Sequence, residues 1–313
     1  MSNATVIINL INSYLILVSS AVLTTIGLIG NFIVIYILTW KNFLKEPFFR
    51  YFLVQEVLNI ISLIIMWIWY LPLYLKWNTS SIFCKSIEYA GYVIYSIYPW
   101  ISVINSVDRL LAFKYPTDFL FRKKFKYQAS AVSFIFIISI LSNVPTYLYF
   151  EKRNSTICGI SSNFTKLYLY SAYIIFVDII PLILMMMSTV IIVRVLIRSK
   201  KRLNVSESRT RELNREKLFF KSVLIMDMWL FICFAPFHIL DLVEAKLRID
   251  TPNFLAKYFY WNLLHNIGFL FIIIQTSCSL FVLLMCNKLF KAKFFELFCC
   301  CIKSDCKQAS RTR

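Results

Sequence analysis

The sequence predicts an all-α membrane protein, a bundle of seven transmembrane helices followed by a short amphipathic helix on the cytoplasmic side. Of its 313 residues, 59% are hydrophobic and the mean hydropathy is +0.68, values well above those of an ordinary soluble domain. Seven apolar stretches are each long enough to cross a hydrocarbon core of about 30 Å. Continuous apolar runs of this length indicate helices rather than the strands of a barrel. Lys and Arg gather in alternate connecting segments, as expected when a chain crosses a membrane repeatedly.

The seven spans fall within residues 13–286, after a short tail at residues 1–12. We place them at 13–39, 47–75, 86–113, 128–150, 167–197, 218–242 and 259–286. The first stretch has no basic flank before it and no small-residue cleavage site after it, so it is predicted to be an uncleaved span rather than a signal peptide. An amphipathic membrane-surface helix at 287–301 and a cytoplasmic tail at 302–313 follow the last span.

The distribution of charge predicts the orientation in the plasma membrane. With the N-terminus outside, the inner segments and their flanks hold 26 of the 34 Lys and Arg residues, and the outer ones hold 8. This bias predicts an extracellular N-terminus and a cytoplasmic C-terminus. The net charge of +18 is therefore assigned to the membrane's inner face, and no nucleic-acid partner is expected. Four of five glycosylation sequons fall in outer segments, the exception being Asn204; the four are Asn3, Asn78, Asn154 and Asn163.

Cysteines divide between the two faces in the same way. Of nine, only Cys84 and Cys158 lie in outer segments, and a lone pair in an oxidising compartment favours a disulfide over two exposed thiols. The amphipathic helix ends in Cys299, Cys300 and Cys301 at the bilayer surface, where S-palmitoylation is the natural modification. A zinc site is the alternative, but consecutive cysteines lack the ligand spacing of one. No metal or cofactor is expected.

An Asp-Arg pair, Asp108-Arg109, interrupts the apolar third span. It lies 25 residues after Cys84, which corresponds to about 37 Å of helix at 1.5 Å per residue. Cys84 is therefore predicted at the outer rim and Arg109 at the inner mouth of the same span. Chemistry alone predicts that the pair lies at the membrane interface and ends the helix.

Several short motifs, in order and on the appropriate spans, resemble those of rhodopsin-like (class A) G-protein-coupled receptors. The resemblance covers nearly the whole chain and rests on the combination, because each motif alone is weak. The matches are Gly30-Asn31 with Val34, Trp77 seven residues before Cys84, Asp108-Arg109 with Pro116, Pro181, and Cys233-Phe234-Ala235-Pro236-Phe237.

This sequence also departs from the family pattern. Leu110 replaces the aromatic residue after Asp-Arg, Phe234 replaces a tryptophan, and Glu56 stands where an Asp is usual. Residues 277–284, SCSLFVLL, occupy the place of the seventh-span NPxxY motif without its Asn, Pro or Tyr. The family's buried ion site, here Asn31 and Glu56, would therefore lose the partners expected at positions 276 and 280.

The resemblance implies a receptor that transmits a ligand signal to a heterotrimeric G protein, with arrestin as a further possible partner. Asp108 and Arg109 would form the resting restraint together with Glu216, while Phe234 and Pro236 belong to the sixth helix, which moves outward on activation. The plain alternative for Glu216 is one charge on a solvated helix face, within a stretch that carries both signs.

Residues near the outer ends of the spans suggest the ligand class. The resemblance argues against a biogenic amine, because Gly91 stands where amine receptors place an Asp, and against an opsin, because residues 258–287 contain no Lys. Acids and aromatic groups would suit a small basic or amidated peptide, as in the invertebrate neuropeptide receptors that the chain resembles. Packing remains the alternative for the aromatic residues. The candidates are Glu88, Tyr92, Tyr95, Asp178, His238 and Asp241.

Three other functions compete with a signalling receptor. An enzyme is disfavoured because the two His residues have no metalloprotease spacing and no nucleotide-binding loop occurs. A transporter would need Gly- and Pro-broken helices or internal repeats, and Asp227 in the sixth span is the one residue that suits it. A decoy that binds ligand without signalling keeps the fold and would explain the altered seventh span.

Overall fold

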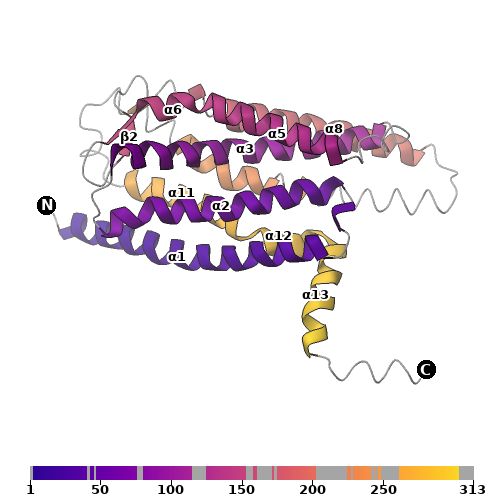
Figure 1. Ribbon diagram of the computed structural model, residues 1–313, viewed down its shortest axis with the longest axis horizontal. Helices are drawn as coiled ribbons and strands as arrows, with labels where there is room; N and C mark the ends of the chain where they lie inside the picture. The colour runs from indigo at the N-terminus through magenta and orange to yellow at the C-terminus, as the bar shows by residue number, and fades with distance from the viewer. Residues whose placement is uncertain are drawn as a thin grey trace.

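The computed structural model shows an elongated bundle of helices that lie roughly along one axis (Figure 1). Its described residues are 3–40, 43–45, 47–75, 80–114, 125–152, 158–160, 171–172, 175–201, 224–226, 228–240, 243, 246–247 and 261–302. The long helices are α1 (Asn3–Trp40), α2 (Pro47–Leu75), α3 (Ser81–Lys114), α5 (Phe125–Ser142) and α8 (Ile180–Lys201). Their long apolar sequences form helices because only intrahelical hydrogen bonds satisfy the backbone in lipid.

Shorter elements complete the described chain. A 3-10 turn, η1 (Phe43–Lys45), joins α1 to α2, and a π-helical turn, η2 (Ile175–Ile179), leads into α8. Residues 228–240 are helical. The remaining helices are α6 (Val144–Tyr149), α11 (Trp261–Ser277), α12 (Ser279–Cys286) and α13 (Lys288–Ile302).

A two-stranded hairpin is the departure from helix among the described residues. Strand β1 (Phe150–Lys152) pairs antiparallel with β2 (Cys158–Ile160), and Lys152 is opposite Cys158. Strand β1 also contacts α3. The hairpin lies at the end of the bundle where α1 begins, and α13 leaves the opposite end at a steep angle (Figure 1). We call these the hairpin end and the α13 end.

The helices confirm the predicted all-α membrane fold, although not every span is resolved as a single helix. Within the described residues, Leu17–Trp40, Phe49–Trp69 and Phe125–Tyr149 are each long and apolar enough to cross a membrane. Leu263–Ser277 and Ser279–Cys286 make a fourth span when taken together, and they meet at an angle of 57°. The last span is therefore less regular than a single continuous helix.

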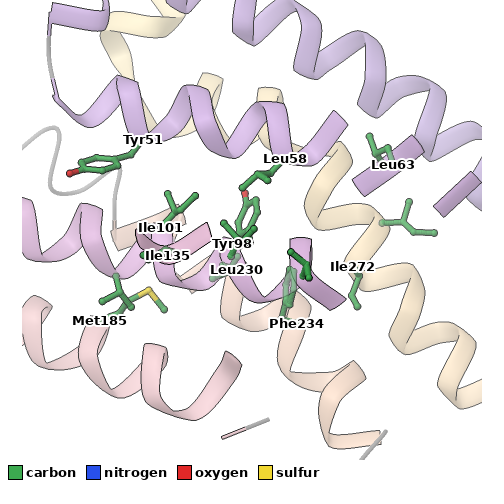
Figure 2. Close-up of a cluster of buried hydrophobic side chains, with 14 of the residues drawn as sticks. Tyr51, Leu58, Leu63, Tyr98, Ile101, Ile135, Met185, Leu230, Phe234 and Ile272 are labelled. Atoms are coloured by element: carbon green, nitrogen blue, oxygen red, sulfur yellow. The ribbon is translucent and has the colours of Figure 1, made fainter. Parts of the chain in front are cut away.

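Two clusters of buried apolar side chains hold the helices together. The central cluster packs residues of α2, α3, α5, α8, α11 and the helical segment 228–240, and Figure 2 shows Tyr98 and Phe234 near its middle. The second cluster lies at the α13 end and contains Phe43, Phe49 and Phe290. Phe290 is fully buried, so the first turn of α13 is anchored in the bundle although the helix then points away from it.

Candidate functional site

A chain of buried polar groups crosses the interior between four helical elements. The Ser279 Oγ on α12 lies 2.7 Å from Asn31 Oδ1 on α1 and 2.8 Å from Glu56 Oε2 on α2. Asn31 Nδ2 donates to the backbone carbonyl of Thr276 on α11 at 3.0 Å. Asn31 and Glu56 are fully buried and Ser279 is nearly so. Buried polar groups usually have hydrogen-bond partners, and the contacts made here join α1, α2, α11 and α12.

The polar chain spans the bend between α11 and α12. Cys278 is the one non-helical residue at this bend, with φ −97° and ψ 8°. Thr276, just before it, directs its hydroxyl back to the carbonyls of Ile272 and Ile273, a pattern that bends helices. Asn31 donates to the carbonyl of Thr276 itself. Side-chain hydrogen bonds therefore accompany a bend that the sequence makes without proline.

A network of aromatic side chains runs from the hairpin end toward the centre. Trp69 Nε1 on α2 donates to Glu88 Oε1 on α3 at 2.5 Å, and the Trp69 ring lies 6.2 Å from that of Phe269 on α11. The ring centroids of Phe269 and Phe237 are 5.7 Å apart. The predicted ligand residue Glu88 thus belongs to a contact that ties α2 to α3, and the network extends to α11.

The two histidines of the chain both join this network at Phe237. The His238 ring lies 5.4 Å and the His265 ring 5.0 Å from the Phe237 ring. His238 is buried, and its ring is 5.9 Å from Phe234. The structure therefore brings His238 and Phe234 together, two residues that the sequence placed in the ligand and activation sets respectively.

Phe234 is enclosed by two tyrosines of α3. Tyr98 stacks on it at a centroid distance of 6.2 Å and an interplanar angle of 20°, and Tyr95 approaches edge-on at 6.2 Å. Phe234 and Tyr98 are both buried. Tyr98 also interacts electrostatically with Glu56. Tyr98 is therefore next to both Phe234 and Glu56, and Figure 2 shows it beside Leu58 of α2.

Polar contacts also tie helices together toward the α13 end. Gln55 Nε2 on α2 donates to Ser102 Oγ on α3 at 2.8 Å. Arg50 Nη1 donates to Gln128 Oε1 on α5 at 3.0 Å, while its Nε donates to the carbonyl of Leu44 in η1. Asp108 is buried near the end of α3. These contacts therefore tie α2 to α3 and to α5.

The structure describes the other predicted site residues to different extents. Cys84 is buried and disulfide-bonded, Tyr92 is half-buried on α3, and Pro236 is half-buried in the helical segment 228–240. The backbones of Arg109, Cys158, Asp178, Asn3 and the cysteines at 299–301 belong to helices or a strand, but their side chains lie outside the described ones. The remaining predicted residues lie outside the described residues altogether: Glu216, Asp227, Asp241, Asn78, Asn154 and Asn163.

The family comparison covers most of this architecture. The family described as "7 transmembrane receptor (rhodopsin family)" matches residues 30–266. The chain belongs to the rhodopsin-like receptor family. The match begins at Gly30, immediately before the buried Asn31, and ends within α11, just after His265. No curated protein sequence matches the chain.

Family membership fixes the broad character of the receptor. Rhodopsin-like receptors are multi-pass plasma-membrane proteins that in general bind an extracellular ligand and act on a G protein, and they are generally not enzymes. The residues that the sequence missed are Ser279 and Tyr98. Ser279 lies in the altered seventh-span motif, where its serine gave no signal of contact with Glu56. Tyr98 was one of 18 tyrosines in an apolar span, and its central position follows only from packing.

Proposed function

We propose that this receptor binds a small basic or amidated peptide at the hairpin end and transmits the signal to a heterotrimeric G protein at the α13 end. The observation that carries the proposal is the aromatic network from Trp69 and Glu88 to Phe234. A carboxylate beside aromatic faces suits a guanidinium or ammonium group, because charge pairing and cation–π attraction act together. The network ends at Phe234, a buried residue of the sixth-span segment. A displacement caused by the bound peptide would therefore be transmitted to the core.

The orientation that this proposal requires has the N-terminus extracellular and the C-terminus cytoplasmic. The disulfide of Cys84 supports it, since disulfides persist in an oxidising compartment. We assign Cys158 as the partner, because β1 contacts α3 and pairs with the strand that Cys158 begins. Glycosylation at Asn3, Asn78, Asn154 and Asn163 and palmitoylation at Cys299, Cys300 and Cys301 agree with the same orientation and complete the proposal.

The proposed transmission step is an outward movement of the sixth helix. At rest, Arg109 would be held by Asp108 and Glu216, and ligand contacts transmitted through His238 and Phe234 would release the helix. Arrestin would bind the same opened face. Tyr92, Tyr95, Asp178 and Asp241 complete the proposed ligand pocket, and Pro236 supplies the bend about which the helix pivots.

The test is G-protein dissociation in cells across a panel of Gα types, with a library of basic and amidated peptides. The wild type should respond to at least one peptide, and Arg109→Ala should lose the response while it retains surface expression and peptide binding. Glu88→Gln should raise the peptide concentration needed by about tenfold or more, the loss of one charge-assisted contact. Glu296→Gln, an exposed acid on α13, is the matched control and should leave the peptide concentration unchanged.

A decoy receptor is the second candidate, favoured by the seventh span without NPxxY. It predicts peptide uptake that is identical in wild type and Arg109→Ala, with no G-protein response in either. A peptide response of the wild type that is lost in Arg109→Ala would exclude the decoy. A transporter would instead show ion or solute flux in proteoliposomes that depends on Asp227.

A further inference from the structure

The hydrogens available to the buried polar chain are too few for Glu56 to be ionised. Asn31 has an amide nitrogen that donates and an amide oxygen that only accepts. Its Nδ2 faces the carbonyl oxygen of Thr276 at 3.0 Å, which can only accept. The reversed amide would place two acceptor oxygens at this distance. The orientation of Asn31 is therefore fixed, and its Oδ1 must face Ser279.

Ser279 has one hydroxyl hydrogen but two oxygen neighbours within hydrogen-bond distance. The contact to Asn31 Oδ1, at 2.7 Å, needs that hydrogen because Oδ1 has none to offer. The contact to Glu56 Oε2, at 2.8 Å, then needs a hydrogen from Glu56. If Glu56 were a carboxylate and took the Ser279 hydrogen, Asn31 Oδ1 and Ser279 Oγ would lie 2.7 Å apart with no hydrogen between them.

The surroundings of Glu56 agree with a neutral acid. The side chain is fully buried, and its second oxygen, Oε1, accepts no hydrogen bond. No Lys, Arg or His among the described residues forms an ion pair with it. The groups that face it are the hydroxyl of Ser279 from α12, the amide of Asn59 on its own helix and the phenol of Tyr98 from α3. A carboxylate without a cation would be very costly there, whereas a neutral acid is not.

We propose that Glu56 is a proton-binding site, a neutral carboxylic acid that donates to Ser279 and starts a directed hydrogen-bond chain. The chain runs from Glu56 to Ser279, from Ser279 to Asn31, and from the Asn31 amide to the carbonyl of Thr276. It links α2, α12, α1 and α11 and closes across the bend at Cys278. Removal of the proton would leave a charge and one hydrogen too few, so the Ser279 hydroxyl would turn to the carboxylate and the bend would lose its side-chain bond from Ser279 to Asn31 of α1. The inference does not depend on the proposed ligand or on G-protein coupling.

Infrared spectroscopy of the purified full-length protein, in a detergent without ester groups, tests this directly. The wild type should show the carbonyl stretch of a neutral carboxylic acid at neutral pH, and Glu56→Gln should lose that band. Glu296→Gln removes an exposed carboxylate that pairs with Lys293 and should retain it. Ser279→Ala should retain the band at a higher frequency, because the acid loses its hydrogen-bond acceptor. A band that survives in Glu56→Gln, or an unmoved band in Ser279→Ala, would overturn the proposal.

Thermal unfolding supplies an independent readout. The side-chain amide introduced by Glu56→Gln can donate to Ser279, so this variant should melt near the wild type, whereas Ser279→Ala should melt at a lower temperature. Wild-type protein should melt at the same temperature in sodium and in choline chloride of equal ionic strength. Stabilisation by sodium that is absent from Glu56→Gln would mean that Glu56 is an ionised cation ligand, and the assignment would be wrong.

Discussion

The contact between α1 and α11 leaves no room for a methyl group at Gly27. A Cβ built there would lie 2.6 Å from Ser277 Oγ, 2.8 Å from Ser277 Cα and 2.9 Å from a methyl carbon of Leu63. The backbone atom decides the outcome, because a change of rotamer cannot move Ser277 Cα away. Gly27→Ala should therefore push α1 from the bend that the polar chain holds. Small residues allow such close approach of helices in membranes.

The expected magnitude follows from two opposing effects. Overpacking costs about 1–3 kcal/mol, while Ala in place of Gly favours a helix by up to about 1 kcal/mol, so a net loss of about 1–2 kcal/mol is expected. Gly91→Ala is the matched control. A Cβ there meets its nearest atoms at 3.9 and 4.0 Å, so only the helix-favouring effect remains, with a gain of about 0.5–1 kcal/mol.

The assay is thermal unfolding followed with a thiol-reactive fluorophore. Cys233 is free and buried, and Cys278 at the bend is free and half-buried, so both react as the bundle opens. At roughly 2–4 °C per kcal/mol, Gly27→Ala should melt several degrees below the wild type and Gly91→Ala slightly above it. If Gly27→Ala melts at or above Gly91→Ala, the close approach of α1 to α11 is wrong.

Three further substitutions test separate contacts by the same unfolding assay. Asn143→Ala removes the hydrogen bond at 3.0 Å to Ser96 and should cost about 0.5–1.5 kcal/mol, the net contribution of one hydrogen bond, because the Ser96 hydroxyl keeps its own bond to the carbonyl of Val93; an unchanged melting temperature would contradict this. Phe290→Ala should cost about 3–5 kcal/mol, whereas Phe295→Ala, 49% exposed on the same helix, should cost far less; equal effects would refute the anchoring of α13. Trp69→Phe keeps an aromatic ring but loses the donor to the Glu88 carboxylate; because this contact is exposed, the loss should be about 0.5–1.5 kcal/mol, and no loss would show that this contact is unimportant.

The helical bundle was predictable from the sequence, because the length of an apolar run and the placement of charge suffice to indicate membrane helices. The burial of Asn31 and Glu56 was also expected, from the resemblance to receptors that have a buried ion site there. The hairpin was not predicted, since strands of three residues with a single pairing partner leave no periodic pattern. The contact of Ser279 with Glu56 was missed because it depends on a bend, and the residues around Cys278 contain neither proline nor glycine to indicate one.

The altered seventh span has a bend but lacks the proline of the NPxxY motif. NPxxY contains a proline, and a proline inside a helix removes a donor and bends the chain. Here the bend occurs without it, at Cys278, with Asn31 bonded to the carbonyl of Thr276 on one side and Ser279 bonded to Asn31 and Glu56 on the other. The geometry is thus retained by side chains from α1 and α2 rather than by the backbone of the seventh span itself. A bend held by hydrogen bonds can be released when one of them breaks, whereas proline's missing donor is permanent. Loss of the motif is therefore a weak argument for a silent receptor.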